Sequence, residues 1–269
     1  MLRLRTVAAR LLFVLPIVLL AVTAGSQPAG AAPNADRHSV FAQPGVLDEK
    51  AEGVTVLADY GAFRLYGVAD AVWKTVPASV QAKTQPMADA HTIYIGTEPI
   101  DTLRPDATLP TNLAAGPLTG PALSLVQFIG PIQQKWLDAL QAQGVTPVHY
   151  IYSNAYLVWT DVQGRLALDR LAAVGAFVQW AGPFHPAYKL GPSLRQALTK
   201  GADVAKQVPL IVQTYDHAGK EATLSFLEQK SLIPVTGNEN VLEYENVRLT
   251  AEMSSVAEIA ARPDVVWVG

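Results

Sequence analysis

The same pattern of apolar residues occurs twice in this chain of 269 residues, at a constant offset of 87. A fixed period with matched apolar positions marks a duplicated folding unit, and it constrains the fold more than any single motif. We therefore expect two copies of one domain in the second half of the chain. The matched pairs are Leu123 with Leu210, Phe128 with Tyr215, Leu137 with Leu224, Leu140 with Leu227, Pro147 with Pro234, Val148 with Val235, Val178 with Val265, Trp180 with Trp267 and Gly182 with Gly269.

Each copy predicts the order strand, helix, strand, strand, helix, strand. Two split β-α-β halves of this kind form an antiparallel four-stranded sheet with both helices on one face, so we predict an α+β fold of tandem ferredoxin-like domains. The other face of each sheet is then solvated, packed on a neighbour, or a docking surface. The predicted strands are 123–128, 148–152, 155–160 and 177–180, then 209–214, 232–236, 241–246 and 265–268; the predicted helices are 132–143, 165–174, 220–230 and 251–261.

The first 31 residues have the pattern of a secretory signal peptide. Arg3, Arg5 and Arg10 precede an apolar stretch of signal-core length, and Ala29-Gly30-Ala31 gives a small-x-small cleavage pattern. The apolar stretch is shorter than the roughly 20 residues that a membrane-spanning helix needs. We therefore expect a secreted, extracellular product with no membrane partner after cleavage.

The remaining chain divides by composition into six regions. Residues 32–52 are predicted as a flexible lead and residues 53–104 as a small β-rich region. The density of proline and glycine predicts a linker at 105–122. The ferredoxin-like units then occupy 123–190 and 208–269, with a second linker at 191–207.

Composition excludes several classes of function. Removing the signal removes three of 20 basic residues and no acidic one, which leaves 17 basic against 23 acidic residues. Such a chain has no electrostatic reason to bind nucleic acid. The absence of cysteine excludes a disulfide framework and thiolate chemistry.

Catalytic and cofactor-binding motifs are also absent from the sequence. Catalysis of the subtilisin type needs a Ser–His–Asp constellation. Asp101-Thr102 begins like the aspartate motif, but Leu103 replaces its glycine, so we interpret Asp101 as a strand-end or turn carboxylate. No two of the five histidines have a metal-site spacing. We predict that this chain is not an enzyme and has no catalytic residue, metal or cofactor.

Three stretches nevertheless resemble a known family, the amino-terminal propeptide or inhibitor-like region of large secreted subtilisin-like serine proteases. They are Leu125-Val126-Gln127-Phe128 with Gly130-Pro131-Ile132, Ala155-Tyr156-Leu157-Val158, and the run from Trp180 to Leu190. Asp59-Tyr60-Gly61 and Ile100-Asp101-Thr102 resemble the same precursors, so the resemblance covers residues 53–269.

The resemblance implies a non-catalytic region that chaperones folding of a protease domain and then inhibits it. The partner would be a subtilisin-like protease domain, in cis or in trans. We expect the contacts to lie on the helix-free sheet faces and in a tail at residues 183–192; the candidate contact residues are Tyr156, Phe184, His185 and Tyr188. Because the sequence given stops at Gly269, where the protease domain is expected, we interpret it as a truncated precursor or a free-standing relative.

Two other functions fit the sequence. Tandem ferredoxin-like domains can serve as an extracellular adhesion or assembly module. A small ligand could also bind in a cleft between the two units. The aromatic residues of the central strands, Tyr150, Tyr152, Tyr156 and Trp159, are interpreted as packing or interface residues, because export and negative charge argue against stacking on RNA bases.

Overall fold

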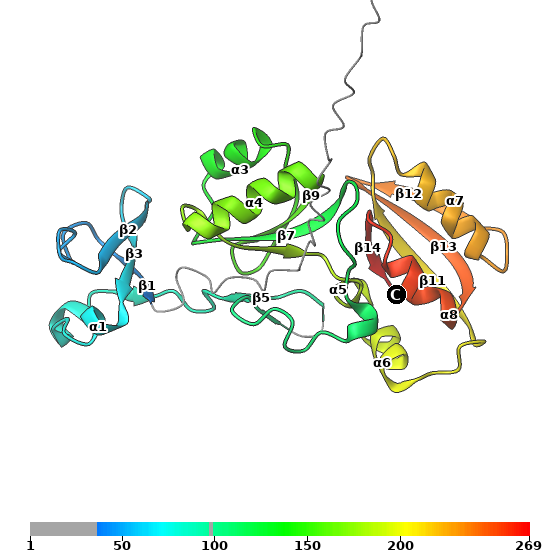
Figure 1. The fold of residues 1–269 in the computed structure, drawn as a ribbon, viewed down its shortest axis with the longest axis horizontal. Coiled ribbons are helices and arrows are strands. Elements are labelled where there is room, and N and C mark those ends of the chain that lie inside the picture. Colours follow the sequence, from blue (N-terminus) through cyan, green and yellow to red (C-terminus); the bar gives the residue numbers. More distant parts are fainter. Residues whose placement is uncertain (1–36, 97–98) are drawn as a thin grey trace, which may run out of the picture. The chain divides into compact units, whose positions relative to one another are not determined.

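The computed structural model describes residues 37–96 and 99–269 (Figure 1). The predicted signal peptide at 1–31 lies outside the described residues. Within these ranges the chain forms three four-stranded sheets, one two-stranded sheet and eight α-helices. All strand pairings in these sheets are antiparallel, which confirms the predicted α+β class. No helix in the described ranges is long and apolar enough to cross a membrane.

The first sheet has the strand order β2-β3-β1-β4. Strand β1 pairs along its whole length with β3, and its Val40 is buried against Tyr66 and Val68. The prediction of a flexible lead at 32–52 is therefore wrong from Arg37 onward. Its apolar positions alternate over only a few residues, which is too short a pattern to stand out. The elements are β1 (Arg37–Ala42), β2 (Val54–Asp59), β3 (Arg64–Ala69), α1 (Asp70–Trp73), α2 (Ala78–Gln81) and β4 (Gln85–Pro86).

Two repeats follow, which we call repeat one (residues 122–183) and repeat two (residues 207–269). Their sheets have the orders β10-β7-β9-β8 and β14-β11-β13-β12, so the first and third strands of each repeat are adjacent and central. Repeat one contains β7 (Ala122–Phe128), α3 (Gln134–Gln141), β8 (Thr146–Ile151), β9 (Ala155–Thr160), α4 (Val162–Val174) and β10 (Val178–Pro183). Repeat two contains β11 (Gln207–Tyr215), α7 (Glu221–Lys230), β12 (Thr236–Val241), β13 (Tyr244–Glu252), α8 (Met253–Ala260) and β14 (Val265–Val268).

Both helices of repeat one pack on the same face of its sheet (Figure 1). Phe128 of β7 stacks on Trp136 of α3 with ring centroids 5.9 Å apart. Helix α4 begins after Asp161, whose carboxylate accepts the Gly164 N–H at 2.9 Å, and ends at Gly175 in the left-handed region at φ 61°. These caps fix the length of the helix that covers the sheet.

The repeats match in the structure with an offset of 87 in the last strand but of 86 in the first. Trp180 pairs with Gln127, and Trp267 pairs with Gln213. The equivalent residues of the first strands are therefore Leu125 and Ile211, Val126 and Val212, and Gln127 and Gln213. The predicted gapless alignment, which pairs Leu123 with Leu210, is wrong here, since a slip of one residue moves a side chain to the other face of a sheet.

The second strand of repeat two also differs from its prediction. It lies at Thr236–Val241 and not at 232–236. The apolar run from Leu232 to Val235 contains Pro234, which has no N–H for a strand ladder. Strand β12 is a polar edge strand, so its sequence lacks the apolar alternation by which strands are recognised.

Both predicted linkers contain ordered structure. Residues 105–122 include the 3₁₀ helix η1 (Thr111–Leu113), and Leu113 is fully buried. Residues 191–207 include α6 (Pro192–Lys200), which starts at a proline and is followed by Gly201 at φ 73°. Proline at the first turn and glycine after the last are helix boundaries as well as linker signals.

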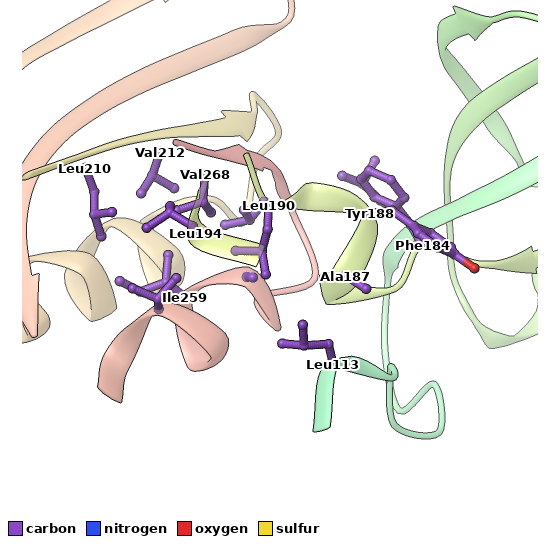
Figure 2. Packing of buried hydrophobic residues seen from close by; sticks show 14 of the residues in the cluster. Leu113, Phe184, Ala187, Tyr188, Leu190, Leu194, Leu210, Val212, Ile259 and Val268 are labelled. Carbon is purple, nitrogen blue, oxygen red and sulfur yellow. The ribbon is translucent and has the colours of Figure 1, made fainter. Parts of the chain in front are cut away.

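Helix α5 (Pro186–Lys189) and helix α6 complete the core of repeat two. Leu190 and Leu194 are buried in one cluster with Val212, Ile259 and Val268 (Figure 2). Leu190 forms a parallel bridge with Val268, and the Gly191 N–H donates to the Val268 carbonyl at 2.7 Å. The segment after repeat one is thus built into repeat two.

Candidate binding surfaces

Three of the four predicted contact residues are buried. Phe184, His185 and Tyr188 lie in or beside α5 and are less than a tenth exposed. The Nδ1 atom of His185 accepts the Ala115 N–H at 2.8 Å, and burial lowers the pKa of His185 to about 4. Burial also raises the pKa of Tyr188 to about 12. The predicted tail at 183–192 is therefore wrong, because the apolar side chains of this segment pack inside the protein.

Tyr156, the fourth predicted contact, lies on the helix-covered face of its sheet. Its ring meets Phe128 edge-on, with centroids 6.4 Å apart, and it packs against the core under α3 and α4. Tyr156 is consequently not on a helix-free face, contrary to the prediction.

Asp101 is the last residue of strand β6 (Ile100–Asp101) and directly precedes a turn. Its carboxylate accepts the Leu103 N–H at 3.0 Å and forms an ion pair with Arg104 at 3.0 Å. These contacts match its interpretation as a turn carboxylate. Among the described residues no group of three or more His, Cys, Asp or Glu side chains could hold a metal ion.

One buried His–Asp pair resembles part of a catalytic arrangement. The His217 Nε2 atom lies 3.1 Å from an oxygen of Asp264, and Thr223 donates its hydroxyl to the other oxygen at 2.6 Å. The second ring nitrogen of His217 accepts the Gly219 N–H at 3.1 Å. Because both ring nitrogens are engaged within the fold, His217 is not placed to activate a nucleophile.

The helix-free face of repeat one is covered by its own chain. We call residues 90–115 the cover segment, of which 97 and 98 lie outside the described part. It contains β5 (Thr92–Ile93), β6 (Ile100–Asp101) and η1. Its Ile93, Ile100 and Leu113 are buried in one cluster with Leu125 and other residues of that face.

A buried network of hydrogen bonds fixes the cover segment to the sheet. Gln127 accepts the Thr102 hydroxyl at 2.9 Å and donates to the carbonyls of Thr92 at 3.1 Å and Ser153 at 3.2 Å. Gln179 donates to Gln127 at 3.0 Å. Burial lowers the pKa of His91 in this segment. Buried polar groups that are satisfied in this way specify one arrangement of the segment on the sheet.

The helix-free face of repeat two is exposed in its centre. We call this surface the open face; it consists of Pro209, Ile211, Gln213, Asn246, Arg248, Thr250 and Trp267. Ile211 and Trp267 are each 41% exposed. Arg248 forms an ion pair with Glu239 at 3.2 Å beside them. A hollow of about 380 Å³ extends from Ile211 and Arg248 to Ile233. Apolar side chains within a polar border are typical of a protein-binding surface.

A second concavity lies between the open face of repeat two and the edge of the sheet of repeat one. It has a volume of about 610 Å³, and we call it the tyrosine cleft. Residues of the cover segment, of both repeats and of the segment that contains α5 line it, and eight of the 17 lining residues are aromatic. The aromatic lining residues are Tyr94, His149, Tyr150, Tyr152, Phe184, Tyr188, Tyr244 and Trp267.

Among the residues that the structure describes, those that line the tyrosine cleft include no aspartate, glutamate, lysine or arginine. The Tyr94 and Tyr152 rings lie 5.4 Å apart and are about half exposed. A hydrogen bond to the Asp89 carboxylate raises the pKa of Tyr94, and burial raises the pKa of Tyr244. The Tyr94 and Tyr244 phenols therefore remain protonated and neutral at physiological pH.

Sequence reasoning identified neither the cover segment nor the cleft walls. Residues 90–104 were assigned to the small β-rich region and residues 105–115 to the linker, and neither pattern predicts that the segment packs on the helix-free face of repeat one. The tyrosines at 150 and 152 are visible in the sequence, but their exposure depends on where the two sheets meet. An aromatic strand whose side chains are not needed in the core is the signal that could have indicated them.

Comparison with known proteins identifies one match. A protein-family model described as "Domain of unknown function (DUF8729)" matches residues 90–185. The matched stretch contains the cover segment and the whole of repeat one, so the two are matched as one unit. No curated protein and no solved structure matches the chain.

Proposed function

We propose that this chain is a non-catalytic, propeptide-like region of a secreted subtilisin-type serine protease, and that it chaperones and inhibits the protease domain. The observation that carries this proposal is the open face of repeat two. Its exposed Ile211 lies on the inner strand β11 and its exposed Trp267 on the neighbouring strand β14, on a sheet face that no described helix covers. The resemblance of residues 53–269 to such precursors supplies the identity of the partner.

The proposal treats both repeats as ferredoxin-like units, of which repeat two binds the protease through its helix-free sheet face. Such a face fits against surface helices of a protease and contributes about 800 Å² per partner in an interface of standard size. Binding of this kind stabilises the folded protease and not its unfolded chain, so it promotes folding by mass action. Since residues 183–192 are part of the core, inhibition depends on the open face and not on a tail.

Inhibition and refolding of a subtilisin-type protease from the same source test the proposal. Residues 32–269 are added to the active protease and, separately, to the denatured protease. We expect dose-dependent inhibition and an increased yield of active enzyme. No effect in either assay would contradict the proposal and would favour an extracellular adhesion or assembly module.

A pair of variants localises the effect. Ile211→Asp places a charge in the centre of the open face, and we expect it to weaken inhibition about tenfold or more. Leu166→Asp is the matched control, because Leu166 is an exposed leucine on α4, on the helix-covered side of repeat one. Equal loss in both variants would show that the open face is not the contact surface.

A further inference from the structure

We infer that the tyrosine cleft binds an extended, uncharged, proline-containing segment of polypeptide. This inference goes beyond the proposed function and does not depend on it, because the cleft and the centre of the open face can be altered separately. It rests on the shape of the cleft, the chemistry of its walls and a contact that the chain already makes with its own proline-rich segment.

The walls suit a segment in the polyproline II conformation. Grooves lined with aromatic rings recognise such segments, because the rings pack against proline and the segment loses little entropy on binding. The Tyr94 and Tyr152 rings lie 5.4 Å apart on one side, and Tyr244 and Trp267 come from repeat two. The Tyr152 and Tyr244 hydroxyls and the Gln213 amide can donate hydrogen bonds to peptide carbonyls.

The electrostatics favour a neutral ligand. A charged segment would lose hydration in the cleft without meeting an opposite charge on the described lining residues, since none of these carries a carboxylate, ammonium or guanidinium group. An oligosaccharide is also neutral. Recognition of its many hydroxyls needs several polar side chains, however, and beyond the tyrosine hydroxyls the cleft offers Gln213 and His149.

The chain itself shows how the wall of the cleft receives proline-rich polypeptide. Tyr188, which lines the cleft, donates its hydroxyl to the Pro105 carbonyl at 3.4 Å. The neighbouring His185 accepts the Ala115 N–H, and Ala114 has the polyproline II angles φ −76° and ψ 143°. Pro105 and Ala115 thus bind to the aromatic pair His185 and Tyr188 through backbone groups. Between them, Asp106 lies 3.9 Å from His185, and the Leu113 side chain is buried in the same cluster as Tyr188. The cleft continues this surface with further aromatic rings.

Titration calorimetry with residues 32–269 tests the inference. The probe is a blocked decaproline peptide, with a blocked Gly/Ser decapeptide and chitohexaose as comparison ligands. We expect saturable binding of decaproline and none of the Gly/Ser peptide. Tyr94→Ala and Tyr152→Ala should each weaken decaproline binding about tenfold. Phe63→Ala, which removes an exposed aromatic ring outside the cleft, should leave it unchanged.

Three outcomes would overturn the inference. The first is the absence of decaproline binding, and the second is that Phe63→Ala weakens decaproline binding as much as the two tyrosine variants do. The third is that chitohexaose binds and that Tyr94→Ala and Tyr152→Ala abolish its binding, which would assign the cleft to sugars. Circular dichroism of each variant checks that the fold is retained. Ile211→Asp should still bind decaproline, so failure of this inference is distinguishable from failure of the proposed protease contact.

Discussion

Repeat one and repeat two place equivalent residues in opposite environments. Leu125 and Ile211 occupy the same position of the first strand, yet Leu125 is fully buried and Ile211 is 41% exposed. Trp180 and Trp267 differ in the same way, at 8% and 41%. The difference arises from the cover segment, which packs on repeat one alone. Exposure of a sheet face in this protein is thus decided by a segment outside the repeat.

The cross-strand partners of Leu125 and Ile211 differ in the same way as these two residues do. Leu157 in repeat one pairs with Leu125, whereas Arg248 in repeat two pairs with Ile211. A buried apolar pair thus corresponds to an exposed pair with one charged member. Repeat two retains an apolar centre within a polar border, as expected of a surface that binds a partner and remains soluble without it.

The largest effect should come from truncating the equivalent aliphatic residues. Leu125→Ala removes a buried side chain and leaves a cavity, so it should lower the free energy of unfolding by about 2–5 kcal/mol. Ile211→Ala removes a half-exposed side chain and should cost less than about 1 kcal/mol. Urea denaturation of both variants measures the difference. Similar losses would mean that the two faces are equally buried in solution.

The junction between the repeats should give the protein a pH-dependent stability. Lys189 of α5 is 3% exposed, donates to the Arg262 carbonyl at 2.8 Å and lies over the Phe184 ring. Burial lowers the pKa of Lys189 to about 7, although the nearby Asp264 opposes the shift. The protonated form of Lys189 is therefore less favourable, relative to the neutral form, in the folded protein than in the unfolded chain.

The sign of the effect follows from proton binding. Between pH 7 and about 10 the unfolded chain binds a proton at Lys189 that the folded protein does not, so stability rises with pH by up to about 1.4 kcal/mol per unit. As the pH falls from about 10 to 7 that stability is lost, and below pH 7 Lys189 is protonated in both states, so the dependence levels off. Lys189→Met should flatten this dependence and raise stability at pH 7 by about 1–3 kcal/mol. Denaturation curves at pH 6.5, 8 and 9.5 would contradict this if wild type and variant changed in parallel.

The equivalent glutamines provide the next comparison. Gln127 is fully buried and makes four hydrogen bonds, with Thr102, Gln179 and the carbonyls of Thr92 and Ser153. Gln127→Leu leaves these partners unsatisfied and should cost about 1–3 kcal/mol. Gln213 is partly exposed and bonds to Asn246 at 3.2 Å, so Gln213→Leu should cost less than about 0.5 kcal/mol. Equal midpoints of thermal unfolding for the two variants would contradict the role given to the network.

The fold was predictable where the apolar pattern is long and regular. Strands at 155–160 and 265–268 lie at their predicted bounds, and the repeated element order follows from the same periodicity. Strands β12 and β1 were not predicted. Both are short, and β12 is also polar. The offset of 86 in the first strand was missed because Leu210, Ile211 and Val212 are all apolar, so apolarity alone does not fix which of them faces the helices.

The candidate surfaces were less predictable than the fold. Phe184 and Tyr188 were selected as aromatic residues in a proline-containing segment that resembles a tail, but they are buried in a cluster formed with the cover segment and both repeats. The exposure of Ile211 depends on the absence of a cover, which no local pattern records. A duplicated sequence predicts two similar units; it does not predict which of the two is covered.

The smallest expected effect concerns Gly182 and Gly269, which lie two residues after Trp180 and Trp267. A methyl group at Gly182 would overlap Cζ2 of Trp180, and one at Gly269 would overlap Cζ2 of Trp267. Trp180 is held under the cover segment and cannot turn aside, so Gly182→Ala should cost about 1–2 kcal/mol, in the range of overpacking. Trp267 is partly exposed and can rotate, so Gly269→Ala should cost less than about 0.5 kcal/mol. Thermal unfolding of both variants measures the difference. If Gly269→Ala cost as much as Gly182→Ala, the Trp267 ring would be as firmly held on the open face as Trp180 is under the cover segment, which would contradict the exposure of that face.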